Sequence, residues 1–387
     1  MKVALGVDVI RFPLTGIGRY AYELAKGLGQ SEEVERLFFL SGRRLGRSFP
    51  SEPGVSPTTA LSSLKRFVGR RFVEHRCVLD IYRSINDVLR VRALMNAEGA
   101  VYHGPNYYLP AYDGPSVATF HDLSVLDCPE FHPPERVAYM RSELPVALER
   151  ADVLLTISEH ARQAVLAYSG FSPERVLAVP LAASSEFKPR TAKECAEVLV
   201  RFGLGFGRYV LYAGTVEPRK NLGRLLDAYE ILPARVKNHF PLVVAGYRGW
   251  CSDEVHVRLQ QAQSEGWAFY LGFVSASDLP VLYSGARIFA FPSLYEGFGL
   301  PLLEAMASGV PVVCSDSTSL PEVGGGYPLM CAPDDVDQLS HLLVRAIEDE
   351  PWRERVIPSG IAHAGSFSWE RTVTGTLKAY RAAMERK

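Results

Sequence analysis

The sequence of 387 residues has almost no net charge, no closely spaced cysteines and no long apolar run. With 42 Lys and Arg against 43 Asp and Glu, it does not have the basic balance of a protein that coats nucleic acid, so we expect no nucleic-acid partner. None of its six cysteines forms a CxxC pair, which excludes the usual zinc and redox motifs and is typical of a reduced, cytoplasmic chain. No run of 18 apolar residues occurs, so no membrane span is expected.

Short apolar strands alternate with amphipathic helices, and this pattern restarts after about residue 185. The expected strands are residues 2–9, 37–40, 100–102, 116–120, 153–157 and 176–179, then 209–213, 242–245, 268–271, 288–291 and 310–314. Such alternation predicts parallel sheets with helices on both faces. We therefore predict two α/β domains, residues 1–185 and 186–367. Residues 368–387 form a last helix, which we place on the first domain although the pattern leaves either domain open.

A glycine motif follows the first strand. Gly16, Gly18 and Ala21 spell GxGxxA, which outlines a dinucleotide fingerprint and suits an anion at a helix N-terminus. A cofactor of the NAD type also needs an acidic residue about 20 positions on, but the sequence there is basic at Arg43 and Arg44. An NAD-type dehydrogenase is therefore a weaker alternative, and a tight turn without a ligand is another.

Two cations follow the first strand of the second half. Arg219 and Lys220 come before a helix expected at residues 221–231, where a guanidinium and an ammonium can clamp a diphosphate. The plainer alternative is that both are solvated loop charges. The spacing is not that of a P-loop.

Two glutamates eight positions apart flank the start of another expected helix, residues 300–308. Glu296 lies in the preceding loop beside Gly297 and Gly299, which can form a backbone nest, and Glu304 lies one turn into the helix. A carboxylate suits two sugar hydroxyls as an acceptor of hydrogen bonds. Spacing alone leaves open that both are solvated helix residues.

Together these motifs resemble, in order and over most of the chain, the retaining glycosyltransferases of family 4. That family has the GT-B fold, in which two Rossmann-like domains face each other across a cleft, and carries an E-x7-E motif. The resemblance implies catalytic roles for His121 at the cleft and for Glu296 on the transferred sugar. It further implies that Gly16 and Lys220 lie beside the donor diphosphate and that Glu304 binds the ribose.

The resemblance also implies that the loop 271–275 reads the nucleotide base through its backbone. The remaining donor-binding residues expected from it are Arg219, Phe273, Val274, Gly297, Phe298, Gly299 and Leu300. Much of the family has Arg where this chain has Thr215, and we expect Arg219 to supply the missing charge.

The implied activity is transfer of a sugar from a nucleotide-diphosphate donor to a glycan or polyprenyl-linked acceptor. The sequence of residues 296–305 and 319–323 is similar to that of bacterial mannosyltransferases of surface polysaccharide and lipopolysaccharide synthesis. This similarity favours GDP-mannose as the donor. A nucleotide-sugar 2-epimerase of the same fold remains an alternative, as does a binding protein without catalysis.

His103 and Asn106 follow the strand next to that of His121 and are acceptor-site candidates. For His121 itself the plainer alternative is a structural role, because a histidine at a strand end is commonly a hydrogen-bonder in the fold. The tripeptide from Asp335 to Asp337 spells a DxD metal motif, but its place at a helix start predicts an N-cap. We therefore expect no essential metal and no cofactor, with paired cations replacing Mg²⁺.

One segment is strongly basic. From Lys65 to Arg92 there are eight Lys or Arg and three acidic residues, with apolar residues at helical spacing. A solvated helical face explains this pattern. The functional alternative is a basic amphipathic helix on an anionic membrane surface, which predicts a cytoplasmic protein peripheral on the inner face of the membrane.

Overall fold

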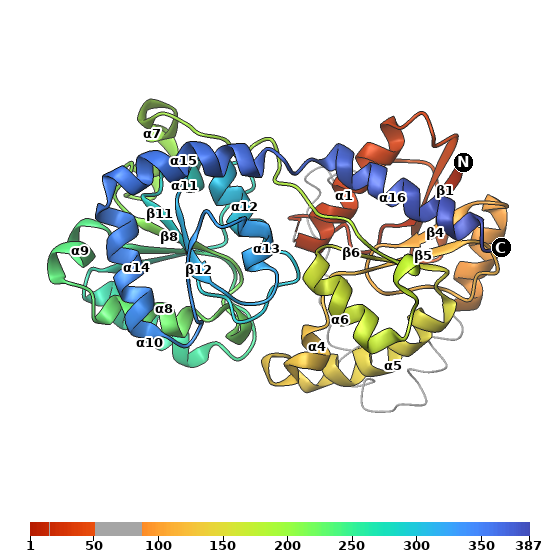
Figure 1. Cartoon of the computed structure of the whole chain (residues 1–387), viewed down its shortest axis with the longest axis horizontal. Coiled ribbons are helices and arrows are strands. Elements are labelled where there is room, and N and C mark those ends of the chain that lie inside the picture. The colour runs from red at the N-terminus through yellow and green to blue at the C-terminus, as the bar shows by residue number, and fades with distance from the viewer. Residues whose placement is uncertain (15, 51–86) are drawn as a thin grey trace, which may run out of the picture.

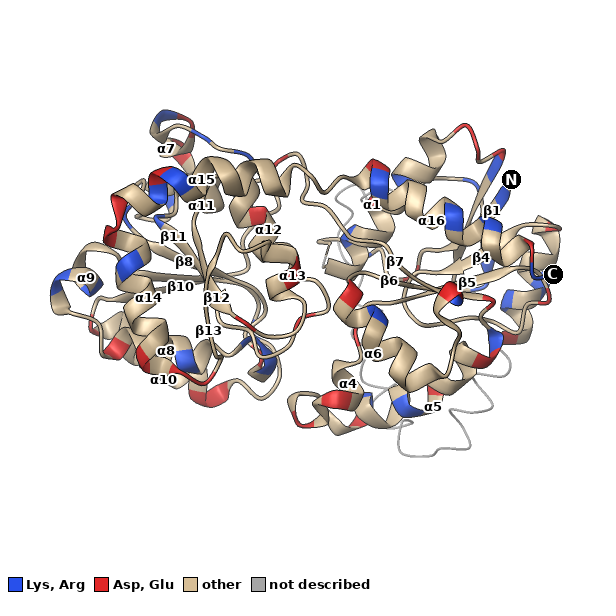
Figure 2. Ribbon diagram, in the orientation of Figure 1, with Lys and Arg blue, Asp and Glu red and all other residues tan. Residues whose placement is uncertain are grey.

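Two mainly parallel sheets, each covered by helices, form two domains that lie side by side (Figure 1). The computed structural model describes residues 1–14, 16–50 and 87–387. Both domains have the α/β, Rossmann-like architecture, so the predicted fold class is confirmed. The strands at the centre of each domain are almost free of charged residues, which concentrate on helices and loops (Figure 2). This distribution reflects sheets that are buried on both faces.

The first domain has a seven-stranded sheet of order β3-β2-β1-β4-β5-β6-β7. Its strands are β1 (Lys2–Gly6), β2 (Arg36–Ser41), β3 (Arg44–Gly46), β4 (Val101–Gly104), β5 (Ser116–Phe120), β6 (Val153–Thr156) and β7 (Val176–Ala178). Its helices are α1 (Gly16–Gln30), α4 (Ser124–Asp127), α5 (Pro134–Arg150) and α6 (Glu159–Ser169), and residues 87–94 are helical too. The edge strand β3 pairs antiparallel with β2 and escaped prediction because it is short and polar.

The second domain has a six-stranded parallel sheet of order β10-β9-β8-β11-β12-β13. Its strands are β8 (Val210–Ala213), β9 (Leu242–Ala245), β10 (Ala268–Gly272), β11 (Ile288–Phe291), β12 (Val312–Ser315) and β13 (Leu329–Cys331). Its helices are α7 (Ala192–Arg201), α8 (Leu222–Glu230), α9 (Ala234–His239), α10 (Asp253–Ser264), α11 (Leu279–Gly285), α12 (Leu300–Ala307), α13 (Leu320–Gly324), α14 (Val336–Glu348) and α15 (Glu350–Ala364). The sequence did not predict β13, whose three residues include no β-branched side chain.

The last helix, α16 (Trp369–Met384), packs against α1, β5 and β6 of the first domain. Thr372 Oγ1 donates to the carbonyl of Pro180 at 2.7 Å, and Tyr380 is fully buried. The chain thus passes from the first domain to the second and back, and both termini lie on the first domain (Figure 1). The boundary that we expected after residue 185 lies between β7 and α7.

The two domains touch at the carboxyl ends of their strands. Trp250 Nε1 donates to the carbonyl of Phe131 at 2.6 Å, and Ser158 Oγ donates to the carbonyl of Gly297 at 2.6 Å. Ligands of parallel α/β sheets bind at this edge, so the contacts define where a shared site lies. None of the helices described here is long and apolar enough to cross a bilayer.

Candidate functional site

The carboxylate of Glu296 is buried between two cations. Its Oε1 accepts from Lys220 Nζ at 2.5 Å, and its Oε2 accepts from Arg219 Nη1 at 3.1 Å. Glu296 lies in the loop after β11, whereas the cations lie in the short 3₁₀ helix η4 (Pro218–Lys220) after β8. Because β8 and β11 are neighbours in the sheet, their carboxyl ends bring these residues together. The side chains of Arg219 and Lys220 are only 14% and 12% exposed, so they are not solvated loop charges.

A second carboxylate balances this cluster. Arg219 Nη2 donates to Glu217 Oε1 at 2.7 Å, so two cations face two buried carboxylates. Burial alone raises the pKa of Glu296, but the charges of Lys220 and Arg219 outweigh it and leave the pKa below its ordinary value. Glu296 is therefore ionised at neutral pH. The sequence analysis did not single out Glu217, although it lies two positions before Arg219.

Asn221 fixes the backbone next to the cations. It adopts a left-handed conformation, with φ of 57°, between η4 and α8. Its Nδ2 donates to the carbonyls of Pro292 and Pro333, at 3.0 and 2.7 Å. This side chain therefore ties η4 to the loops after β11 and β13 and holds Lys220 near Glu296.

Glu304 lies in α12, is 7% exposed and forms no ion pair with the residues that the structure describes. Burial raises its pKa to about 8, and the positive charge of Arg19 in α1 of the other domain offsets this only in part. The carboxyl group is therefore mainly protonated at pH 7. A protonated carboxyl that faces the opposite domain can release its proton when a ligand supplies hydroxyl donors.

Gly297 and Gly299 are required for different reasons. Gly299 has φ of 96°, a conformation that favours glycine, directly before α12. A Cβ on Gly297 would lie 2.1 Å from the carbonyl oxygen of His121 in the first domain. Gly297 thus permits the close approach of the two domains, and Pro301 lies in the first turn of α12, where its missing N–H costs no hydrogen bond.

His121 follows β5 and is 5% exposed. Its Nε2 lies 2.8 Å from the carbonyl oxygen of Pro105, which only accepts, so Nε2 carries the proton and Nδ1 is an acceptor. Burial lowers the pKa of His121, which keeps the imidazole neutral. The neighbouring Asp122 caps the next turn, as its Oδ1 accepts from the backbone and hydroxyl of Ser124.

The two acceptor candidates differ. His103 is fully buried, and its Nδ1 and Nε2 lie 2.8 Å from the hydroxyls of Tyr380 and Thr119, respectively. Both ring nitrogens are thus used inside the first domain, and the structure does not bring this side chain to the domain interface. Asn106 follows Pro105, the partner of His121, and its buried Oδ1 has no hydrogen-bond partner among the described residues.

The remaining donor-site candidates present backbone more than side chain. Phe298 is buried in the core and Val274 is 7% exposed, whereas Phe273 is 48% exposed. The ring of Phe273 stacks on Tyr247 with centroids 4.7 Å apart, and the sequence analysis missed Tyr247. Gly16 begins α1, and no described atom lies within 4 Å of where its Cβ would be. Leu300 is the first residue of α12.

Two further predictions concern metal and membrane. Asp335 is the N-cap of α14, because its side chain accepts from Gln338 N at 2.8 Å, as predicted. No group of three or more His, Cys, Asp or Glu in the described ranges could hold a metal ion. Residues 65–86 of the basic segment lie outside the described residues, and Arg90 near its end forms an ion pair with Asp8.

Two family models match the chain, one in each domain. The model of Glycosyltransferase Family 4 matches residues 14–186, and that of Glycosyl transferases group 1 matches residues 205–363. The chain is 41% identical over 383 residues to the O-antigen chain mannosyltransferase B of Escherichia coli, covering 98% of this chain and 100% of that protein. It is 30% identical to the MMP alpha-(1->4)-mannosyltransferase of Mycolicibacterium hassiacum, over 60% of this chain and 54% of the relative.

Solved structures share the fold at low identity. Sucrose-phosphate synthase from Thermosynechococcus elongatus superposes with a TM-score of 0.73 at 19% identity, over 100% of both chains. Anabaena Alr3699/HepE in complex with UDP-glucose superposes with a TM-score of 0.68 at 17% identity, over 98% of this chain and 99% of the other. These neighbours have the two-domain arrangement described above.

Proposed function

Because the chain belongs to glycosyltransferase family 4, we propose that it transfers mannose from GDP-mannose to a glycan or polyprenyl-linked glycan with retention of configuration. It is a glycosyltransferase of GT-B fold, 41% identical to a mannosyltransferase over 98% of its length. The relatives described above are transferases, which favours transfer over the 2-epimerase and dehydrogenase alternatives. The observation that carries the proposal is the contact of Glu296 with Arg219 and Lys220 at the edge where the domains meet.

The donor diphosphate binds beside Arg219 and Lys220. Lys220 has three N–H donors and uses one of them on Glu296, so it keeps capacity for phosphate oxygens. Gly16, at the start of α1, faces the same edge and offers backbone N–H groups. These groups stabilise the negative charge that grows on the leaving nucleotide, which lowers the barrier by several kcal/mol.

Glu296 and His121 contact the transferred sugar. Glu296 accepts hydrogen bonds from sugar hydroxyls while the adjacent cations keep it ionised. His121 offers Nδ1 as a neutral acceptor from the opposite domain. The acceptor hydroxyl attacks the face that the nucleotide leaves, and Asn106 is placed next to Pro105 to orient it.

The nucleoside lies between Glu304 and the loop that follows β10. Glu304 accepts from the two ribose hydroxyls after losing its proton. Phe273 and Tyr247 give the base an aromatic surface, and the backbone of Val274 supplies polar contacts. Gly297, Phe298, Gly299 and Leu300 contribute backbone groups at the start of α12.

We propose no essential metal ion and no cofactor. The positive charge that Mg²⁺ provides in other transferases comes here from Arg219 and Lys220. Added chelator should therefore leave the transfer rate unchanged.

If the acceptor is the polyprenyl-linked glycan, the protein works in the cytoplasm at the inner membrane face. The basic composition of residues 65–92 supports this placement. Anionic liposomes should bind the protein, and replacing the lysine and arginines of residues 65–83 by glutamine should abolish that binding.

Donor identity is tested by thermal shift with GDP, UDP and ADP. GDP should give the largest rise in melting temperature, since only a ligand of the native state stabilises it. Product analysis with GDP-mannose should then show mannose on an acceptor glycan. Release of an epimerised nucleotide sugar without an acceptor would support the 2-epimerase instead.

A further inference from the structure

We propose that the first domain positions the carboxylate of Glu296 by holding both residues that flank it, through Asp127 and Ser158, and that Glu322 latches this contact. The inference rests on the proposed function, because it gives the closed arrangement a role at the Glu296 site. Asp127, Ser158 and Glu322 are positioning residues in this account and do not touch the substrate.

The second domain holds Glu296 through its carboxylate, which accepts from Lys220 and Arg219, and through its backbone. Thr318 Oγ1 accepts from the Glu296 amide at 2.9 Å, and Ser319 Oγ donates to its carbonyl at 2.9 Å. Thr318 adopts φ of 52°, a left-handed conformation that is strained for a non-glycine residue. A strained residue that bonds to Glu296 indicates that this backbone position is tightly specified.

The first domain holds the residues on either side. Tyr295 OH donates to Asp127 Oδ2 at 2.8 Å. On the other side, the carbonyl of Gly297 accepts from Ser158 Oγ at 2.6 Å. Ser158 is completely buried, and the absence of a Cβ on Gly297 lets it approach the carbonyl of His121. The segment that carries Glu296 is thus gripped by both domains.

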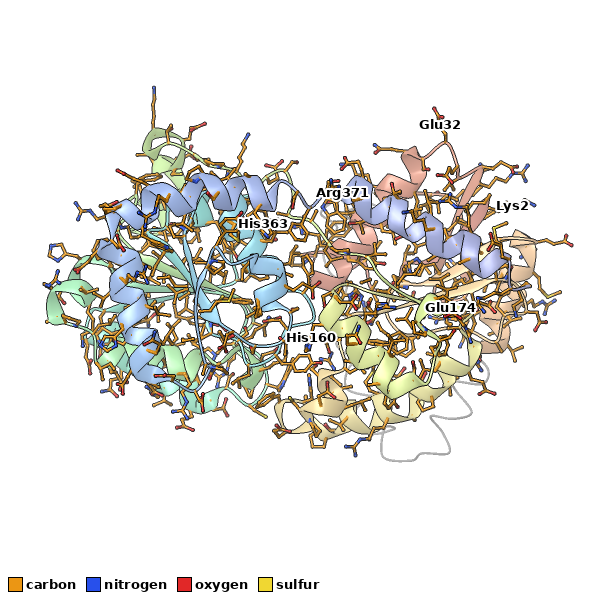
Figure 3. All side chains as sticks on the ribbon, viewed as in Figure 1. Lys2, Glu32, His160, Glu174, His363 and Arg371 are labelled. Carbon is orange, nitrogen blue, oxygen red and sulfur yellow. The ribbon has the colours of Figure 1, made fainter. Side chains whose placement is uncertain are left out.

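Glu322 in α13 forms a further contact between the domains, next to that of Ser158 with Gly297. Its Oε1 and Oε2 accept from the backbone amides of Glu159 and His160, at 2.8 and 3.0 Å, at the start of α6. The first amides of a helix lack internal partners and carry partial positive charge, so a carboxylate binds them well. Figure 3 shows His160 at the end of α6 nearest the second domain.

These contacts form one continuous path. Glu322 follows Ser319 by three positions, and Ser158 is the N-cap of the helix that Glu322 binds. Loss of the Glu322 contact therefore loosens Ser158 and, through it, the carbonyl of Gly297. Arg219 and Lys220, the cations beside the diphosphate, belong to the second domain, and only Gly16 adds a contact from the first, so the latch should affect nucleotide binding much less than turnover.

Hydrogen exchange of the peptide that spans residues 292–300 tests the inference. Glu322→Gln, which changes only an exposed side chain, should speed exchange in this peptide and lower kcat about tenfold, with a much smaller effect on the affinity for GDP. Tyr295→Phe should act in the same direction, and Ser158→Thr, which keeps the hydroxyl, should remain closer to wild type than Ser158→Ala. Glu354→Gln, an exposed glutamate of α15, is the matched control and should change neither quantity.

The exchange measurement needs no substrate, so it remains decisive if the transfer activity proves to be different. Unchanged exchange of residues 292–300 in Glu322→Gln and Tyr295→Phe would overturn the latch. Faster exchange beside a wild-type kcat would overturn the positioning role.

Discussion

Nζ of Lys220 lies 2.5 Å from Oε1 of Glu296, although 76 positions separate the two residues in the chain. The pair exists because β8 and β11 lie side by side, where the strand order of the sheet reverses direction. A cation suited to a diphosphate and a carboxylate suited to a sugar are thereby joined at one point. This relationship is the basis of the following predictions.

Binding of GDP should release about one proton near pH 7. Burial raises the pKa of Glu304 to about 8 in the free protein, whereas the ribose contact requires the carboxylate. Affinity should therefore fall up to about tenfold for each unit of pH below 8. Calorimetric titration in buffers of different ionisation enthalpy measures the proton release directly.

Glu304→Gln is the control for that titration, because it removes the titrating group. The variant should bind GDP more weakly and release no proton.

The raised pKa of Glu304 also has a consequence for folding, because the native state holds the proton of this carboxyl group more tightly than the unfolded chain does. Glu304 therefore costs stability increasingly from about pH 4.5 to about pH 8, and Glu304→Gln should stabilise the protein more at pH 8 than at pH 5. Equal proton release on GDP binding by wild type and Glu304→Gln would contradict this account of Glu304.

Gly297→Ala should prevent the two domains from closing as they do here. The added Cβ would meet the carbonyl oxygen of His121 at 2.1 Å, whereas the conformation of Gly297 itself needs no glycine. The radius of gyration from X-ray scattering should rise and kcat should fall at least a hundredfold. Gly223→Ala is the matched control, because its Cβ would meet Val255 at an ordinary 3.9 Å. A wild-type radius and rate in Gly297→Ala would show that this contact is not needed.

His121→Ala should lower kcat by about tenfold to a hundredfold, because it removes the stabilisation that one or two hydrogen bonds give to the transition state. Because burial lowers the pKa of His121, the wild-type pH–rate profile should show no limb due to this imidazole between pH 6.5 and 8. Comparison of the two profiles is the test. A limb near pH 7 that disappears in His121→Ala would mean that the histidine is charged in the working enzyme.

His103 should act on stability and not on the acceptor. Burial lowers its pKa to about 3, so the unfolded chain binds a proton that the native state resists. Stability should therefore fall by about 1.4 kcal/mol for each pH unit below about 6.5, on account of this residue. Urea unfolding of wild type and His103→Gln at pH 7, 6 and 5 measures the difference. Loss of acceptor affinity in His103→Gln without any loss of stability would restore the residue to the acceptor site.

The alternation of strands and helices was enough to predict two α/β domains, because each strand and each helix follows from its local pattern of apolar residues. The pattern likewise placed Arg219, Lys220 and Glu296 after strands, and Glu304 one turn into a helix. The sequence alone could not show that Lys220 and Glu296 touch, because that depends on β8 and β11 being neighbours. Pattern reasoning also placed His103 with His121, but Tyr380, which comes from the far end of the chain, holds it in the core.

The contacts between domains were the least predictable part. Ser158 looks like an ordinary N-cap in the sequence, and its bond to Gly297 spans 139 positions. Glu217 and Tyr247 gave no distinctive signal either, because a loop carboxylate and an exposed aromatic ring gain meaning only from the groups that they meet.

The most direct test of the central claim is the affinity for GDP of wild type, Lys220→Ala and Lys193→Ala, measured by titration calorimetry at pH 8. Lys193 is an exposed lysine of α7 in the same domain and serves as the matched control. We predict that Lys220→Ala weakens GDP binding by at least a hundredfold while its circular dichroism stays native, and that Lys193→Ala binds as wild type does. Binding of GDP by Lys220→Ala at wild-type affinity would contradict the assignment of this cluster to the donor diphosphate.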